Sequence, residues 1–104
     1  MICVKINGQL YPASVDGQMV DTAWDNRSSK AITLEMDYAT ANAMFVNDLK
    51  WSIVDTDDTC GAEWDNSEYC VAGDLTDHRD GTITAKMGKL TDLEEAYEIM
   101  LGGI

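Results

Sequence analysis

The feature that most constrains the fold is a set of short runs of alternating apolar and polar residues, separated by residues that favour tight turns. Residues 2–6 alternate and lead into Asn7-Gly8, which favours a two-residue hairpin turn because both central positions take positive φ. A second run at 9–15 returns from this turn, and in residues 30–36 the apolar side chains again share one face. The pattern is typical of an antiparallel sheet built from hairpins.

Further turn signals set the expected limits of the strands. Asp16-Gly17 predicts a second turn, and Gly81 supplies the positive φ that ends a later hairpin turn. Pro12 donates no hydrogen bond, so we expect its strand to lie at an edge or to bulge there. The predicted strands are residues 2–6, 9–15, 18–24, 30–36, 50–54, 67–75 and 81–87.

Two segments have helical rather than strand periodicity. Asp37 can cap a helix at 38–49, and Thr91 and Glu94 have the spacing of a capping box at the start of a second helix, 91–101. The apolar stripe of this second helix consists of Leu93, Ala96, Tyr97, Met100 and Leu101. The predicted fold class is α+β: a single domain, residues 1–104, with a largely antiparallel sheet and one central and one C-terminal helix packed on it.

The tripeptide Trp-Asp-Asn occurs twice, at 24–26 and 64–66. The residues that follow the two copies share no aligned apolar positions, whereas a duplicated unit would keep its core pattern. We therefore interpret each copy as an Asx-type turn, in which Asp or Asn bonds the local backbone and Trp covers the edge of the core. The alternative is that Trp24 or Trp64 is an exposed anchor for a partner.

The charge balance excludes some classes of function. The chain has 19 Asp and Glu against 7 Lys and Arg, a formal net charge of −12, and no visible basic patch. An anionic protein is repelled by phosphate backbones and anionic lipids, so we expect no direct nucleic-acid binding and no membrane binding. No apolar run approaches the roughly 18 residues that a transmembrane helix needs. Three cysteines without close spacing indicate a reducing, cytoplasmic setting.

The sequence offers no recognisable catalytic or metal site. Residues 55–61 (DTDDTCG) resemble the start of a calcium loop, but the glycine falls at the seventh position and the twelfth is Asn66 instead of a bidentate Glu. One His and three scattered Cys provide no zinc set. His78 lies at an expected hairpin tip, where a general base is hard to orient. We therefore expect a protein that is not an enzyme and has no cofactor or metal.

The second half of the chain carries most of the acid. Residues 55–80 contain nine carboxylates against Arg79 alone, with aromatic residues between them, and 55–67 is expected to be an acidic loop. Such a run is either a solvated face that aids solubility or a surface that imitates a polynucleotide and occupies a cationic groove of a host protein. The candidate partner-binding residues are Asp55, Asp57, Asp58, Glu63, Trp64, Asp65, Glu68, Tyr69, Asp74, Asp77 and Asp80.

The two arginines allow a different hypothesis, in which the protein binds a small ligand. Arg27 and Arg79 lie on expected loops beside Asp and Asn, which either neutralise them or leave them to grip a phosphate-bearing ligand. In the second case Trp24 or Trp64 stacks on a base. The candidate ligand-binding residues are then Trp24, Arg27 and Arg79.

Residues 24–54 (WDNRSSKAITLEMDYATANAMFVNDLKWSIV) followed by 63–89 (EWDNSEYCVAGDLTDHRDGTITAKMGK) resemble small acidic proteins encoded in prophages of gut clostridia. Some proteins of that setting are anti-CRISPR proteins that inhibit the type II effector nuclease. The resemblance implies a phage-encoded inhibitor of a host defence system, acting in the cytoplasm of the bacterial host cell on a CRISPR effector nuclease. Two alternatives stay open: a small tail or head component of the virion, and a sponge that sequesters a nucleotide immune signal.

Overall fold

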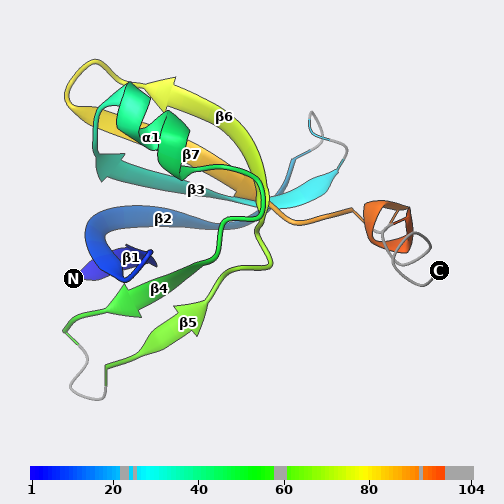
Figure 1. The fold of residues 1–104 in the computed structure, drawn as a ribbon, viewed down its shortest axis with the longest axis horizontal. Helices are drawn as coiled ribbons and strands as arrows, with labels where there is room; N and C mark the ends of the chain where they lie inside the picture. The colour runs from blue at the N-terminus through cyan, green and yellow to red at the C-terminus, as the bar shows by residue number, and fades with distance from the viewer. Residues whose placement is uncertain (22–23, 25, 58–60, 92, 98–104) are drawn as a thin grey trace.

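The computed structural model describes residues 1–21, 24, 26–57, 61–91 and 93–97. These residues form a small α+β domain dominated by one seven-stranded antiparallel sheet, with strand order β5-β4-β1-β2-β3-β7-β6 (Figure 1). The elements are β1 (Ile2–Ile6), β2 (Gln9–Asp21), β3 (Arg27–Glu35), α1 (Tyr38–Met44), β4 (Trp51–Asp55), β5 (Glu63–Asp65), β6 (Val71–Asp77) and β7 (Thr82–Gly88). Residues 93–97 form a second short helical segment.

The long strand β2 joins the two halves of the sheet. Its first residues pair with β1, ending at Cys3 opposite Pro12, and its later residues pair with β3, beginning at Ala13 opposite Leu34. Beyond the two-residue Asn7-Gly8 turn, hydrogen-bonded and non-bonded pairs alternate, so the nitrogen of Pro12 points away from β1. The expectation that this strand lies at an edge or bulges at Pro12 is wrong, because β2 lies between β1 and β3 and its register shifts only between Asp16 and Met19. Pro12 lies where one partner strand gives way to the next.

The expected turn at Asp16-Gly17 is wrong, because β2 runs through it. The strand register instead shifts between Asp16 and Met19, the sign of a bulge, and Gly17 does not have positive φ. The turns at Asn7-Gly8 and at Gly81 do adopt positive φ, as predicted. The residues that favour a tight turn also favour a bulge within a continuous strand, so the local sequence does not distinguish the two.

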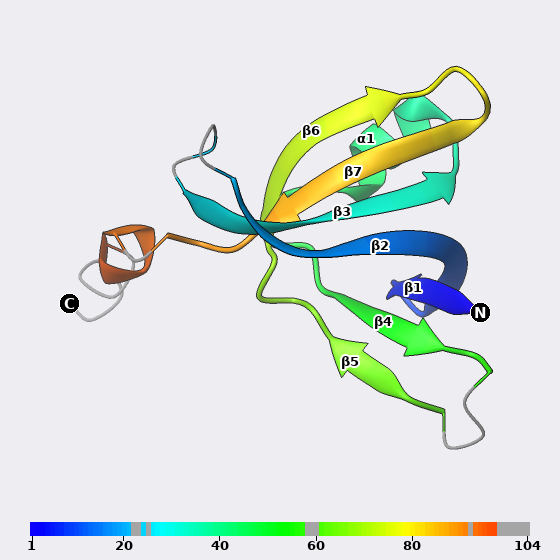
Figure 2. The ribbon, with the colours of Figure 1, turned by 180° about the vertical axis from the view of Figure 1, so that it is seen from behind.

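The core lies on one face of the curled sheet, which we call the inner face. Val4 and Ile6 of β1 and Trp51 of β4 face it from one half, and strands β3 and β7 face it from the other. The helix α1 covers this face over β6 and β7, as the views from front and back show (Figures 1 and 2). The buried core residues are Val4, Ile6, Ile32, Leu34, Ala41, Phe45, Leu49, Trp51, Tyr69, Ile83, Ala85 and Met87. Cys3 is also buried, on the opposite face of β1.

The central helix is shorter than the sequence predicts. Asp37 caps it as expected, with its carboxylate accepting the N–H of Thr40 at 2.6 Å, but the helix ends at Met44 and not at residue 49. The next residues bind the start of β6: the N–H of Asp48 donates to the carbonyl of Cys70 at 2.7 Å, and the side chain of Asn47 accepts the N–H of Ala72 at 2.9 Å. These bonds replace a further turn of helix.

The predicted packing of a C-terminal helix on the sheet is not confirmed. In Figures 1 and 2 the helical segment 93–97 projects beyond the end of the sheet. Leu93 is 81% exposed and Tyr97 is 62% exposed, so these stripe residues are not buried. Met100 and Leu101 lie outside the described residues.

The segment expected to be an acidic loop contains a strand. Residues 63–65 form β5, which pairs with β4 and places Trp64 opposite Ile53. The next predicted strand, 67–75, begins later, at Val71, because residues 66–70 cross from one half of the sheet to the other. A strand of three exposed residues is too short to show a period in the sequence.

Two valines in the sheet test where the core lies. Val4 is fully buried on the inner face and Val20 is 63% exposed. Val4→Ala should lower the free energy of unfolding by about 2 to 3 kcal/mol, because it removes buried methyl groups and leaves a cavity. Val20→Ala should change it by less than about 0.5 kcal/mol. Urea unfolding of both variants measures the difference, and equal effects would contradict this placement of the core.

Candidate binding surface

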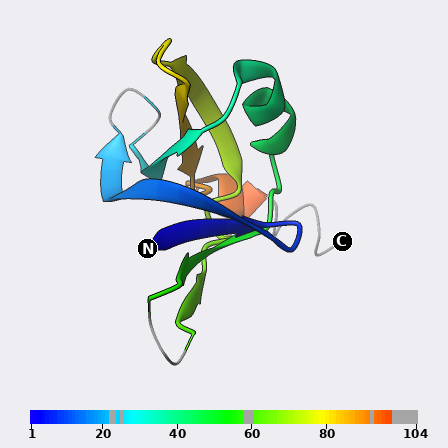
Figure 3. The ribbon, with the colours of Figure 1, turned by 90° about the vertical axis from the view of Figure 1, so that its left-hand side faces the viewer.

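Three strands that run toward the same end of the molecule each finish in a carboxylate. These last residues are Glu35 of β3, Asp55 of β4 and Asp77 of β6. The arrowheads of β3, β4 and β6 point to one end of the long axis in Figures 1 and 2, and Figure 3 looks onto that end. We call this end, with the turns that follow the three strands, the acidic end. Its described carboxylates are Glu35, Asp37, Asp55, Asp57, Asp77 and Asp80.

Most of these carboxylates are held by backbone N–H groups of the turns. The side chain of Asp55 accepts the N–H of Asp57 at 3.0 Å, and that of Asp77 accepts the N–H of Arg79 at 2.9 Å. Asp80 accepts both the N–H and the hydroxyl of Thr82, and the hydroxyl bond is the main reason that the pKa of Asp80 is lowered. The negative charges at this end are therefore fixed in orientation.

Two cationic groups lie among these carboxylates. The N-terminal amine of Met1 forms ion pairs with Asp55 and Asp57, and the bond to Asp57 is the main cause of the raised pKa of that amine. Arg79 lies in the β6–β7 turn with positive φ. The other charged group nearby, Glu63 on β5, pairs with Lys5 at 3.4 Å. The acidic end keeps a net negative charge.

The predicted strip from 55 to 80 is not one continuous surface. Its members on β4 and β5 and its members on β6 belong to opposite edges of the sheet. Asp74 lies in the middle of β6. Asp65 accepts the hydroxyl and the N–H of Ser67, and these bonds lower the pKa of Asp65. They form the Asx turn that was expected for the second Trp-Asp-Asn. Asp58 and Asp25 lie outside the described residues. Glu35 and Asp37, which the sequence reasoning missed, lie beside the β6–β7 turn because Glu35 pairs with Thr82.

Tyr69 does not belong to an exposed binding surface. It is 2% exposed and packs in the core. Lys30 lies over its ring at 4.7 Å and Lys89 at 5.2 Å, while Glu68 pairs with Lys89 at 3.4 Å. Burial is the main reason that the pKa of Lys30 is lowered. Tyr69 is thus buried beneath Lys30 and Lys89, while Glu68 is exposed and pairs with Lys89.

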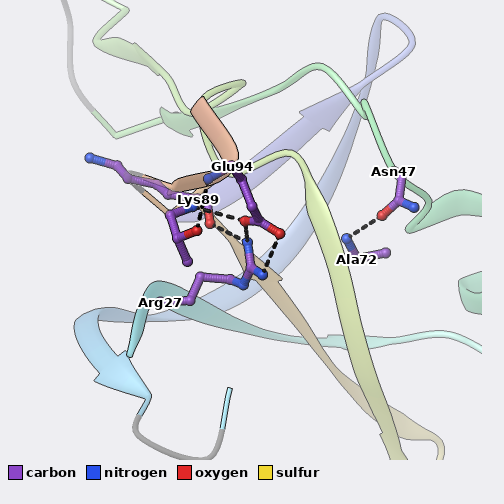
Figure 4. Close-up of polar contacts among 6 residues, drawn as sticks. Arg27, Asn47, Ala72, Lys89 and Glu94 are labelled. Carbon is purple, nitrogen blue, oxygen red and sulfur yellow. Dashed lines mark hydrogen bonds and ion pairs between the residues drawn. The ribbon is translucent and has the colours of Figure 1, made fainter. Parts of the chain in front are cut away.

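Trp24 and Arg27 form a second cluster of this kind on the outer face. The guanidinium carbon of Arg27 lies 4.8 Å from the centroid of the Trp24 ring. Arg27 is buried, and its guanidinium donates to the carbonyl of Lys89 at 2.7 Å and to both carboxylate oxygens of Glu94 at 2.6 and 3.1 Å (Figure 4). It holds the C-terminal segment against the start of β3.

The two arginines of the ligand-binding alternative are not brought together. Arg27 begins β3 at the end where Ser29 pairs with Gly88, and Arg79 lies beyond the opposite end of β7. Both terminal nitrogens of Arg27 are engaged by Lys89 and Glu94, and its Nε is buried without a hydrogen-bond partner. The geometry therefore does not favour a phosphate grip by Arg27 and Arg79.

The cations gather at the end opposite the acidic end. Arg27 and Lys30 lie near the start of β3, Lys50 precedes β4, and Lys86 and Lys89 lie near the end of β7. The sequence reasoning missed this cluster, since its members are up to about sixty positions apart; the β3–β7 register brings those of β3 and β7 together, and Lys50 comes from the start of β4. The molecule is thus polarised in charge along its long axis.

Comparisons with protein-family models, with curated proteins and with solved structures found no match. Among the described residues, no group of three or more His, Cys, Asp or Glu side chains could hold a metal ion. His78 is exposed and bonds Thr84 at 2.7 Å. None of the helices in the described part of the chain is long and apolar enough to cross a membrane.

Gly88 is required by the close packing of Trp24 and Arg27. A Cβ atom at Gly88 would lie 2.4 Å from Cδ of Arg27 and 2.9 Å from the Trp24 ring, whereas at Gly17 it would meet nothing within 4 Å. Gly88→Ala should cost about 1 to 3 kcal/mol of unfolding free energy through overpacking. The control Gly17→Ala should be neutral or stabilise by up to about 1 kcal/mol. Thermal and urea unfolding of the two variants measure this, and a harmless Gly88→Ala would refute the packing argument.

The ion pair between Arg27 and Glu94 should make stability depend on pH. Hydrogen bonds from Arg27, and then from Thr91, lower the pKa of Glu94 from 4.5 to about 2. Because the folded-state pKa is below the unfolded one, the stabilisation is complete above pH 4.5 and is lost as the pH falls toward 2. The stability difference between the wild type and Glu94→Gln, measured by urea unfolding, should shrink across this range. A difference that is constant with pH would contradict the pairing.

Proposed function

We propose that this protein is a non-enzymatic inhibitor that binds a cationic nucleic-acid site of another protein through its acidic end. In the setting that the sequence resemblance implies, it is phage-encoded and the partner is a host defence nuclease, specifically a CRISPR effector of type II. The inhibitor then competes with nucleic acid for a positively charged channel that recognises backbone phosphates.

One observation carries this proposal. Glu35, Asp55 and Asp77 end three strands that point the same way, and a further carboxylate, Asp37, Asp57 or Asp80, follows each of them. Asp is common in the turns that follow strands because its side chain bonds the local backbone, so the support comes from the three strand ends lying at one end of the molecule. The opposite end holds most of the cations, so the field of the molecule is directed and not uniform.

The way in which these charges are held also supports a binding role. A carboxylate side chain whose Oδ1 accepts a turn N–H is already held in one rotamer in the free protein. Less side-chain entropy is therefore lost on association. The lowered pKa of Asp37 and Asp80 keeps both side chains ionised well below neutral pH. A fixed, permanently charged surface suits a cationic groove better than mobile side chains do.

Charge-neutral variants of equal size test the proposal. The five substitutions E35Q, D55N, D57N, D77N and D80N remove the acidic end but keep side-chain oxygens that accept turn N–H groups. This variant should inhibit target-DNA cleavage by a guide-loaded type II effector nuclease at least about fivefold less well, since each of the five exposed ion pairs contributes about 0.2 to 1 kcal/mol. The inhibition by the wild type should weaken with added salt.

A second variant with the same change in net charge is the control. The substitutions D48N, D65N, E68Q, D74N and E95Q lie away from the acidic end. They should reduce inhibition by less than about threefold. Equal losses in both variants would show that net charge and not the acidic end matters. A wild type that inhibits no such nuclease but is recovered in purified virions would replace the proposal with the structural alternative.

A further inference from the structure

Among the described residues, two aromatic rings are covered by cations of the same chain. Arg27 lies over the ring of Trp24 at 4.8 Å, with Lys86 at 6.0 Å. Lys30 and Lys89 lie over the ring of Tyr69. For Trp64, no cation over the ring is found among the described residues. Of the exposed aromatic residues Tyr38, Trp64 and Tyr97, Trp64 has the ring that binds a cation best, and its π face is left to an outside partner.

The surroundings of Trp64 favour a positive charge. It is 53% exposed on the edge strand β5, between Glu63 and Asp65 along the chain. It lies opposite Ile53 on the inner face, and because side chains alternate along β4, Asp55 lies on that same face as its diagonal neighbour. By the same alternation Glu63 and Asp65 point to the opposite face, so Asp55 shares a face with this half-exposed indole while Glu63 and Asp65 add to the negative field at this edge.

We infer that Trp64 is the anchor of the interface and that it receives an arginine side chain of the partner. The guanidinium stacks on the indole face while its N–H groups reach the carboxylate of Asp55. This inference concerns one edge of the proposed binding surface and rests on the proposed function. It adds the chemical identity of the contact, which net charge alone does not specify.

The preference for arginine over lysine follows from the shape of the site. A guanidinium is planar and weakly hydrated, so it can stack on an aromatic ring and donate to carboxylates at its edge at the same time. An ammonium group is compact and strongly hydrated, and satisfies one of these contacts at a time. The chain itself shows the arrangement, since Arg27 stacks on Trp24 while it bonds both oxygens of Glu94.

Binding of octa-arginine and octa-lysine peptides, followed by calorimetry at low salt, tests the inference. The wild type should bind octa-arginine about two- to fivefold more tightly, the range expected for an exposed cation–π contact. Trp64→Leu keeps an apolar side chain without the aromatic face, so it should bind both peptides with nearly equal affinity. The control Tyr97→Leu changes an exposed aromatic residue at the other end of the molecule and should keep the preference.

Lys5 provides a variant with an effect of the opposite sign. Its ammonium group pairs with Glu63 at 3.4 Å, and both side chains are partly exposed. Lys5→Ala releases this carboxylate, so it should tighten the binding of both peptides while leaving their ratio unchanged. Weaker binding by this variant would show that Glu63 does not take part.

The outcomes separate the inference from the proposed function. If the wild type binds both peptides in a salt-dependent way but shows no arginine preference, or if Trp64→Leu keeps that preference, the anchor is refuted and the acidic end stands. If the wild type binds neither peptide at low salt, the proposed function fails and the anchor fails with it. Urea unfolding of Trp64→Leu establishes that the variant is folded.

Discussion

The pairing of β3 with β7 determines the arrangement of charge in this molecule. Its register sets Glu35 opposite Thr82 at one end and Ser29 opposite Gly88 at the other. At the first end the β6–β7 turn comes to lie beside the start of α1, with the N–H of Met36 donating to the carbonyl of Gly81 at 3.2 Å. A shift of this register by one residue would turn every side chain of β3 to the other face. It would disrupt both the core and the separation of charge.

At the cationic end the same pairing leaves room for a packed polar cluster on the outer face. Gly88 and Gly73 have no side chains, so the Trp24 ring lies directly on the sheet and Arg27 fits between that ring and Glu94. The burial pattern of β3 reflects this, because Arg27 and Ser29 are buried on the outer face while Ile32 and Leu34 are buried on the inner face. The cations are thus used to hold the molecule together.

Local sequence signals predicted the hairpins at Asn7-Gly8 and Gly81, the cap at Asp37 and the antiparallel α+β class, because turn and capping chemistry acts within a few residues. The sequence could not show that β2 continues through Gly17, since a bulge and a turn use the same residues. Nor could it show which of the acids meet, because Glu35 and Asp77 are brought to one end by strand register and not by spacing. The sequence therefore placed the candidate site in one continuous segment, residues 55–80. In the structure, the acidic end combines residues from separate strands.

The separation of charge has a consequence for how a partner is approached. Since Arg27, Lys30 and Lys89 are engaged by Glu94, Tyr69 and Glu68, the cationic end offers few free charges to an anionic surface. The acidic end keeps a net negative charge although the N-terminal amine pairs with Asp55 and Asp57, so a cationic groove would orient the molecule end-on before any contact forms. Steering of this kind selects the side of approach but not the residue contacted, because screened charges act over about 8 to 10 Å. A short-range element such as a stacked guanidinium on Trp64 is what makes such an encounter specific.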